Sequence, residues 1–506
     1  MRLLAGSLIS ALLLCAQQQT HFSQVMGRMS TYHVYLPNGY AASQQRYPVI
    51  YWLHGYEAGE DARAAEVSGW VAKHDAIVVD SGPVETAGNY PLYLAELADR
   101  VDRTLRTVAG RGHRAVSGYG SGGFLALWEA SKAPDLIAVA SALIPARSAT
   151  VGPEGFETDT ALEDLRIDPE SVRTRLFNSA DVAAALDFDL GAFGDSPAKP
   201  ATFDHADPYP NFTIWGWEAI SNRKRPGLTE LDDVSAHGFH SVVREWLPGG
   251  AAIPEVRLSV TSPHLFPPHT SHTVTYIRLS DGKVRRAAQR TDPQGRLTFD
   301  LDGGEYEVGI GAGAVMALSG YEFAEGAWAT AGAPVKLKLR FWNKGAERSE
   351  PAIVKWESPT PGVRFASPTA RVPAIPPGAS AAVPVTFTAS GTQRGSVEIR
   401  AMRLAIEIPV YPPAPVAAKF QILDETDHDG NASPGEAFTV ALPDGRAELI
   451  TSDPCVDTSM RVVEEGVRYT HAVIRANCQP GVRVHFLART ATSYAAIELP
   501  IWYKLP

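Results

Sequence analysis

The sequence predicts an α/β domain near the N-terminus, followed by a train of all-β domains. From Ser30 to about residue 146, short apolar runs alternate with amphipathic helical stretches, a pattern typical of βαβ units. After about Thr202, apolar and polar residues alternate with a period of two between frequent Gly, Pro, Asn and Asp turns. The chain has 506 residues, and domains of roughly 100 to 200 residues are usual. We therefore expect several domains rather than one core.

The α/β region contains dense apolar runs that end at glycine-containing turns. Such runs are typical of parallel strands buried on both faces. Apolar residues from Leu94 to Val108 recur at helical spacing, with charged residues on the opposite face, which predicts a helix packed on the sheet. We expect strands over residues 32–36, 47–53, 76–79, 114–117 and 136–140.

The remainder of the chain reads as β-rich modules joined by turns and a stiff linker. Turn signals that favour hairpins recur at residues 280–282, 292–295 and 302–304. A proline-rich run at 411–415 indicates a linker between two later blocks. We expect an α/β domain over 27–200, a β-rich domain over 201–328, and immunoglobulin-like (Ig-like) β-sandwiches over 329–412 and 416–506.

The N-terminal residues 1–16 have the pattern of a signal peptide. Arg2 precedes a short apolar run, and a small residue then leads into polar sequence. The run is shorter than the roughly 20 apolar residues that span a bilayer, and no later segment approaches that length. We therefore expect a secreted, periplasmic or extracellular protein without a transmembrane segment. Cys455 and Cys478 form either one disulfide in an oxidising compartment or two buried thiols.

The charge balance excludes a broad cationic surface. The formal net charge is -10 at pH 7, and the sequence has no Lys/Arg run that would bind a phosphate backbone. We therefore expect no nucleic-acid partner.

Two motifs at strand ends carry the chemistry. His54-Gly55-Tyr56 follows one apolar strand, and Gly118-Tyr119-Gly120-Ser121-Gly122-Gly123 follows another. With these motifs, residues 31–146 resemble the Putative esterase family, which includes esterase D and the feruloyl and acetyl-xylan esterases. The resemblance implies an α/β-hydrolase-like fold, a serine nucleophile at the centre of the glycine-rich turn, and an oxyanion-hole N–H near Tyr56.

The register of the glycine-rich turn places Gly120 where the family has its serine. Glycine has no side chain that could attack a carbonyl, so the resemblance predicts an impaired site. Ser121, one residue further on, is the alternative nucleophile; its other interpretation is a helix N-terminal residue that hydrogen-bonds locally.

The acid and the base of a catalytic triad are expected after the serine, on loops that follow two further strands. Residues 146–201 read as loop plus a helical stretch from Asp181 to Leu186, which indicates a truncated hydrolase domain. The best acid candidate is Asp195, and the best base is His240 or His205. Each histidine has an ordinary alternative, in which it belongs to the β region.

A second motif lies in the last module and has the spacing of a calcium loop. Oxygen ligands at positions one, three, five and twelve, with glycine at six, can wrap a calcium ion around a sharp bend. Its first residue is Glu instead of the usual Asp, and an Asp-rich turn before a strand is the alternative interpretation. The predicted structural ligands are Glu425, Asp427, Asp429, Asn431 and Glu436.

These observations favour two functions of different classes. The first is a secreted esterase-family protein that has lost ester hydrolysis and acts in binding or scaffolding at the cell surface. The second is an active carboxylic-ester hydrolase, similar to the carbohydrate esterases, that uses Ser121. Polysaccharide or another cell-surface component is the expected partner of the β modules, which is compatible with the first function.

Overall fold

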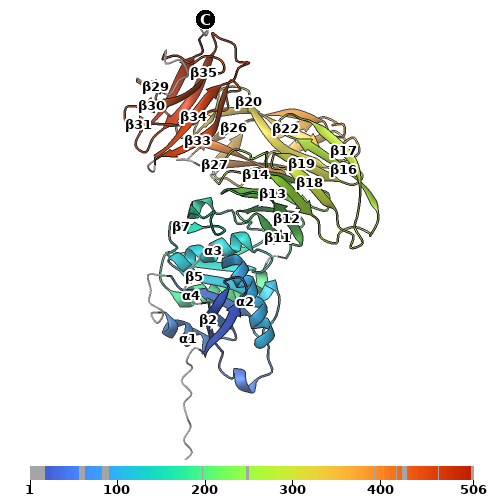
Figure 1. Ribbon diagram of the computed structural model, residues 1–506, viewed down its shortest axis with the longest axis vertical. Coiled ribbons are helices and arrows are strands. Elements are labelled where there is room, and N and C mark those ends of the chain that lie inside the picture. Colours follow the sequence, from blue (N-terminus) through green and yellow to red (C-terminus); the bar gives the residue numbers. More distant parts are fainter. Residues whose placement is uncertain are drawn as a thin grey trace, which may run out of the picture. The chain divides into compact units, whose positions relative to one another are not determined.

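The fold is taken from a computed structural model of the chain (Figure 1). The structure describes residues 17–55, 63–81, 90–196, 198–246, 250–390, 395–402, 404–417, 419–423, 430–464 and 467–502. The expected signal peptide, residues 1–16, lies outside the described residues. The chain divides into two compact units: Met1–Thr270 with Arg290–Glu305, and Ser271–Gln289 with Tyr306–Pro506.

A seven-stranded sheet forms the centre of the N-terminal domain, in the order β1-β2-β4-β3-β5-β6-β9. β1, β2 and β4 pair antiparallel, whereas β4, β3, β5, β6 and β9 pair parallel. The five strands predicted from apolar runs correspond to β2 to β6. The bounds are β1 Gln17–Ser23, β2 Arg28–Tyr35, β3 Val49–Leu53, β4 Ile77–Asp80, β5 Arg114–Tyr119, β6 Val139–Leu143 and β9 Arg173–Phe177.

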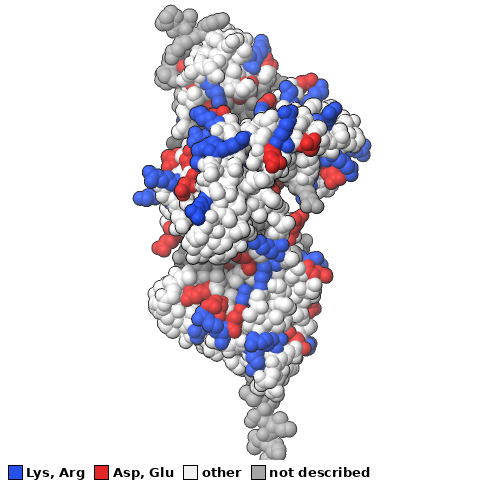
Figure 2. Space-filling model, turned by 90° about the vertical axis from the view of Figure 1, so that its right-hand side faces the viewer, with Lys and Arg blue, Asp and Glu red and all other residues white. Residues whose placement is uncertain are grey.

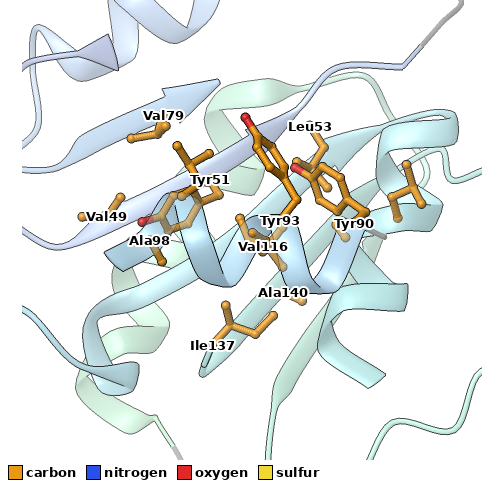
Figure 3. Close-up of a cluster of buried hydrophobic side chains, with 14 of the residues drawn as sticks. Val49, Tyr51, Leu53, Val79, Tyr90, Tyr93, Ala98, Val116, Ile137 and Ala140 are labelled. Atoms are coloured by element: carbon orange, nitrogen blue, oxygen red, sulfur yellow. The ribbon is translucent and has the colours of Figure 1, made fainter. Parts of the chain in front are cut away.

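Helices cover both faces of this sheet, as buried parallel strands require. On one face, side chains of α2 pack on alternate residues of β3, where Tyr90 and Tyr93 lie with Val49, Tyr51 and Leu53 (Figure 3). The intervening β3 residues point into a second core with α1 and α4. The helices are α1 Ala64–Val71, α2 Tyr90–Thr104, α3 Ser121–Lys132 and α4 Val182–Ala192.

The segment after β6 contains one complete βα unit, formed by β9 and α4. The expected helical stretch is present, and Asp181 caps it by accepting a hydrogen bond from the Ala184 N–H at 3.0 Å. The structure adds a strand that the sequence did not indicate, because β9 exposes four of its five residues and lacks an apolar run. A short antiparallel hairpin precedes it, with strands β7 Ser148–Val151 and β8 Thr158–Ala161.

The chain then leaves the α/β sheet and enters β structure, as predicted. β10, β13 and β14 pair antiparallel in that order, and β11, β12, β15 and β18 form a four-stranded sheet. The rings of Trp217, Phe239 and Phe299 pack together in this region. The bounds are β10 Phe203–Asp207, β11 Asn211–Ile214, β12 Trp217–Ser221, β13 Leu228–Ser235, β14 Gly238–Arg244, β15 Arg257–Thr261 and β18 Thr298–Asp302.

The second unit is built from strands over its described length, with one core in its middle part. That core lies among β20, β22, β26 and β28 and includes the fully buried side chains of Phe341, Phe387 and Ile408. The bounds are β16 Ser271–Arg278, β17 Val284–Arg290, β19 Tyr306–Ile310, β20 Met316–Phe323, β21 Ala329–Thr330, β22 Pro334–Asn343, β23 Ala352–Lys355, β24 Val363–Phe365, β25 Thr369–Val372, β26 Ser380–Ala389, β27 Gly395–Ala401 and β28 Leu404–Tyr411.

The last block has its own core, in which Phe438 and Phe486 meet edge to face. Cys455 and Cys478 form a disulfide in this block, with their Cα atoms 5.2 Å apart. The bounds are β29 Gln421–Leu423, β30 Ala437–Leu442, β31 Gly445–Arg446, β32 Glu448–Ile450, β33 Val456–Glu464, β34 Val467–Ile474, β35 Arg483–Arg489 and β36 Tyr494–Pro500.

Charged side chains of both signs are mixed on one face of the molecule (Figure 2). On the face drawn in Figure 2, Lys and Arg side chains are interspersed with Asp and Glu side chains and with wide uncharged areas. Among the described residues, no helix is both long and apolar enough to cross a membrane. The expected absence of a nucleic-acid partner stays a prediction.

Candidate active site at the carboxyl edge of the sheet

Gly120 forms the apex of the bend between β5 and α3. Its backbone angles, φ 58° and ψ -121°, lie in a region that L-residues with a side chain rarely adopt. A strained strand-to-helix turn of this kind is where hydrolases of this fold hold their nucleophile above the sheet. The structure therefore places a residue without a side chain at the apex of this bend.

Backbone hydrogen bonds hold this apex against β6. The Gly120 N–H donates to the Leu143 carbonyl at 3.0 Å, and the Gly120 carbonyl accepts from the Ala146 N–H at 2.9 Å. The neighbouring glycines allow α3 to approach β3 and β5 closely. A Cβ atom on Gly118 or Gly122 would lie well inside 3.0 Å of a backbone oxygen, the Gly122 one against Leu53. The bend thus has the geometry of a nucleophile turn, with a glycine at its apex.

Ser121 is the first residue of α3 and is half-buried. Its backbone N–H follows the apex directly, which is the position that supplies one oxyanion-hole donor in this fold. Its hydroxyl is displaced from the apex by one residue. The second expected oxyanion residue, Tyr56, lies outside the described residues.

The candidate acid and base lie on other elements. Asp195 is exposed in the turn Phe193–Asp195 after α4, where its carbonyl accepts a hydrogen bond from Arg173 Nε at 2.8 Å. The loop that directly follows β9 instead carries Asp181, whose carboxylate caps α4. Asp195 thus lies in a turn after α4, whereas Ser121 lies at the start of α3.

Both candidate bases belong to strands of the β region. His240, in β14, lies between the carboxylates of Asp232 and Glu305, each at 3.3 Å. His205, in β10, is buried, and its Nε2 lies 2.9 Å from the Asp207 carboxylate. Each imidazole therefore contributes to the side-chain contacts of the β region. This is the ordinary interpretation that the sequence also allowed.

A pair of titratable residues that the sequence analysis did not join lies at the same edge as Gly120. His54 follows β3 and Asp80 ends β4; their side chains are buried, with His54 Nε2 3.7 Å from Asp80 Oδ1. Because the carboxyl ends of neighbouring parallel strands meet at one edge of a sheet, adjacent strands β3 and β4 bring the two together. The signal in the sequence was a polar residue at the end of each apolar run.

A second polar pair lies beside it. The Ser81 hydroxyl and the Tyr90 hydroxyl are 2.5 Å apart, at the end of β4 and the start of α2. Burial raises the pKa of Tyr90 well above its ordinary value, so this phenol stays protonated at neutral pH. An imidazole beside a carboxylate can act as a base, but the apex of this edge has no side chain from which to take a proton.

The helix that begins at the apex carries two buried ionisable groups. Glu129 is fully buried, and neither carboxylate oxygen has a hydrogen-bond partner among the described residues. Burial raises its pKa well above the usual range. Lys132 is also buried, donates to the Ala206 carbonyl in β10, and has its pKa lowered by burial to about 8. β10 therefore contacts the end of α3 that carries the buried Lys132.

We expect Glu129→Gln to raise stability at neutral pH. Burial raises the pKa of this carboxyl in the folded state above its unfolded value of about 4.3. The folded state is therefore most stable below about pH 4.3, where the carboxyl is protonated in both states. The wild-type protein should then lose about 1.4 kcal/mol per pH unit as pH rises from about 4.3 to the folded pKa. The glutamine variant should lack that slope in urea denaturation measured between pH 4 and pH 8. Parallel pH profiles of the two proteins would contradict the prediction.

Two of the five predicted calcium ligands are described. Glu436 is buried, and its Oε2 accepts a hydrogen bond from the Ser433 N–H at 2.9 Å. Asn431 precedes it in the same turn region, whereas Glu425, Asp427 and Asp429 lie outside the described residues. In the part of the chain that is described, no group of three or more His, Cys, Asp or Glu side chains could hold a metal ion. The calcium loop therefore stays a prediction.

The parallel sheet, the helices on both faces and the bend at Gly120 define an α/β-hydrolase type of domain. Residues 23–163 match the family described as Putative esterase, so this part of the chain is an esterase-family domain. No curated protein matches the chain by sequence.

Several solved structures resemble part of this chain. A ferulic acid esterase has 22% identity and a TM-score of 0.24, over 27% of this chain and 61% of its own. The ferulic acid esterase of Anaeromyces mucronatus has 21% identity and a TM-score of 0.25, over 32% of this chain and 70% of its own. S-formylglutathione hydrolase of Staphylococcus aureus has 16% identity and a TM-score of 0.24, over 27% of this chain and 60% of its own.

Proposed function

We propose that this esterase-family protein is impaired in ester hydrolysis and acts in binding or scaffolding at the cell surface. The observation that carries the proposal is Gly120 at the apex of the bend. Removing the serine of a hydrolase triad costs about 10⁶ in kcat even when the remaining groups stay in place. The route of the chain also supports the loss of hydrolysis. Within the described residues, the segment after α4 enters β10 in the β region and does not add another strand to the α/β sheet.

The remaining parts of the chain suit an exported binding protein. A disulfide between Cys455 and Cys478 favours an oxidising compartment, and the pattern of residues 1–16 favours export. In this proposal the two C-terminal blocks are Ig-like sandwiches that bind polysaccharide or another surface component. The loop at 425–436 would hold a structural calcium ion.

We expect the wild-type protein to show no labelling by a fluorophosphonate probe and no turnover of short aryl esters. The reason is that no hydroxyl stands at Gly120. The measurement is gel fluorescence after probe treatment, with a feruloyl esterase as positive control and the Ser121→Ala variant as matched control. Labelling that is lost in Ser121→Ala would overturn the proposal.

That same outcome would support the alternative, an active carboxylic-ester hydrolase that uses Ser121. The observation in its favour is the buried His54–Asp80 pair at the same edge of the sheet. Turnover that disappears in both Ser121→Ala and His54→Gln would assign hydrolysis to this edge. Turnover that survives Ser121→Ala would exclude Ser121 as the nucleophile.

A further inference from the structure

β9 is the last strand of the seven-stranded sheet, and one side of its backbone pairs with β6. The Arg173 N–H donates to the Ala138 carbonyl, and the Phe177 carbonyl accepts from the Ile144 N–H. Successive peptide groups of a strand point to opposite sides. The N–H and C=O groups of Thr174 and Leu176 therefore point away from β6, where no strand pairs with them among the described residues.

The side chains of β9 are also largely exposed. Residues 173–176 are exposed, and Leu176 is 52% exposed although it is a large apolar residue. Natural edge strands are protected by proline, a bulge or a covering segment, or by charged side chains. Of these devices, β9 shows only charge among the residues that the structure describes, and Arg173 and Arg175 carry it. Its outward peptide groups are therefore able to accept another strand.

The two arginines give this edge a positive character. The Arg175 guanidinium lies over the rings of Phe177 and Phe188, at 4.7 and 5.6 Å, and within the described residues it forms no ion pair. Arg173 donates to a backbone carbonyl of the turn after α4. Because Arg173 and Arg175 alternate with Thr174 and Leu176, cationic and less polar side chains lie on opposite faces of the strand.

A second copy of this chain is a poor occupant of the edge. Antiparallel pairing of two β9 strands through Thr174 and Leu176 would set Arg175 directly opposite its own copy. Like charges opposite one another destabilise a strand pair. A segment with a carboxylate opposite Arg175 and apolar residues opposite Thr174 and Leu176 would instead complement both faces.

We propose that the outer edge of β9 docks an extended acidic segment of a partner protein, which adds to the sheet as an antiparallel strand. Main-chain hydrogen bonds to Thr174 and Leu176 supply binding, and the alternating side chains supply specificity. This inference rests on the proposed binding role and names a class of partner for it. The docking edge lies apart from the Gly120 apex in the sequence and needs no chemistry there.

The test uses the full chain and a labelled peptide of alternating Val and Glu residues, acetyl-Val-Glu-Val-Glu-Val-Glu-Val-amide. We expect saturable binding in fluorescence anisotropy that weakens with added salt. Leu176→Pro removes an outward N–H, which an edge strand tolerates, together with the leucine side chain, and should weaken binding at least tenfold. Leu176→Ala is the matched control, because it keeps that N–H and should bind more tightly than the proline variant.

A second variant tests the charge and does not depend on proline. Arg175→Glu should weaken binding of the Glu peptide and favour a peptide with Lys in place of Glu. Circular dichroism and thermal unfolding check that each variant is folded. Equal binding by wild type and a folded Leu176→Pro would overturn the inference. It would also fall if the Lys peptide bound the wild type equally well, or if neither peptide bound.

Two further outcomes distinguish this inference from self-association of the chain and from the proposed loss of hydrolysis. A concentration-dependent dimer that is lost in Leu176→Pro would assign the edge to a second copy and overturn the acidic partner. Fluorophosphonate labelling of the same wild-type sample would overturn the proposed loss of hydrolysis, whereas peptide binding reports only on β9.

Discussion

Gly122→Ala should destabilise the first unit by about 3 kcal/mol or more. The added methyl group would overpack the core against backbone atoms, which cannot move aside as a flexible side chain can. The added Cβ atom would lie well inside 3.0 Å of the Leu53 carbonyl oxygen. That oxygen belongs to the last residue of β3, so either α3 or the strand must move. The measurement is urea denaturation followed by tryptophan fluorescence, with the transition of the first unit analysed separately.

Gly69→Ala is the matched control for this prediction. Gly69 lies in α1, and a Cβ atom there would meet nothing within 4 Å. Replacing an exposed helical glycine by alanine usually stabilises by roughly 0.5–1 kcal/mol. A Gly122→Ala protein that unfolds at the same urea concentration as the wild type would contradict the close contact between α3 and β3. That contact also sets the position of the Gly120 apex.

The sequence predicted the parts of the α/β fold whose burial leaves a compositional trace. β3 and β4 are buried on both faces, so nearly all of their residues are apolar. β9 gave no such trace, because it is an edge strand in which only Phe177 is buried. β1 was missed for a related reason, since only two of its seven residues are buried. A strand that is buried on one side only, or that lies at a sheet edge, does not need to be apolar throughout. Its sequence therefore lacks the apolar run on which the prediction relied.

The candidate site was predictable only where neighbours in the sequence are neighbours in space. The bend at Gly120 is local, so its residues could be found from their spacing. The His54–Asp80 pair depends on β3 and β4 being adjacent in the sheet, which spacing alone does not give. Asp195 lies in the turn after α4, whereas the loop that follows β9 carries Asp181. Residues from separate loops can be joined only when the strand order is known.

The second unit contains a buried ion pair whose disruption should have an effect as large as that of Gly122→Ala. Lys344 Nζ lies 2.9 Å from Glu307 Oε2, and the two side chains are 1% and 3% exposed. The Ser319 hydroxyl also donates to Glu307. Removing one partner of a buried pair leaves a charge in a medium that solvates it poorly, at a cost of about 3–5 kcal/mol.

Lys344→Met should therefore destabilise the second unit by about that amount, as measured by urea denaturation at pH 7. The double variant with Glu307→Met should regain most of the loss, because it removes both charges and keeps similar volume. If the double variant were no more stable than the single one, Lys344 would stabilise the fold by packing rather than by charge pairing.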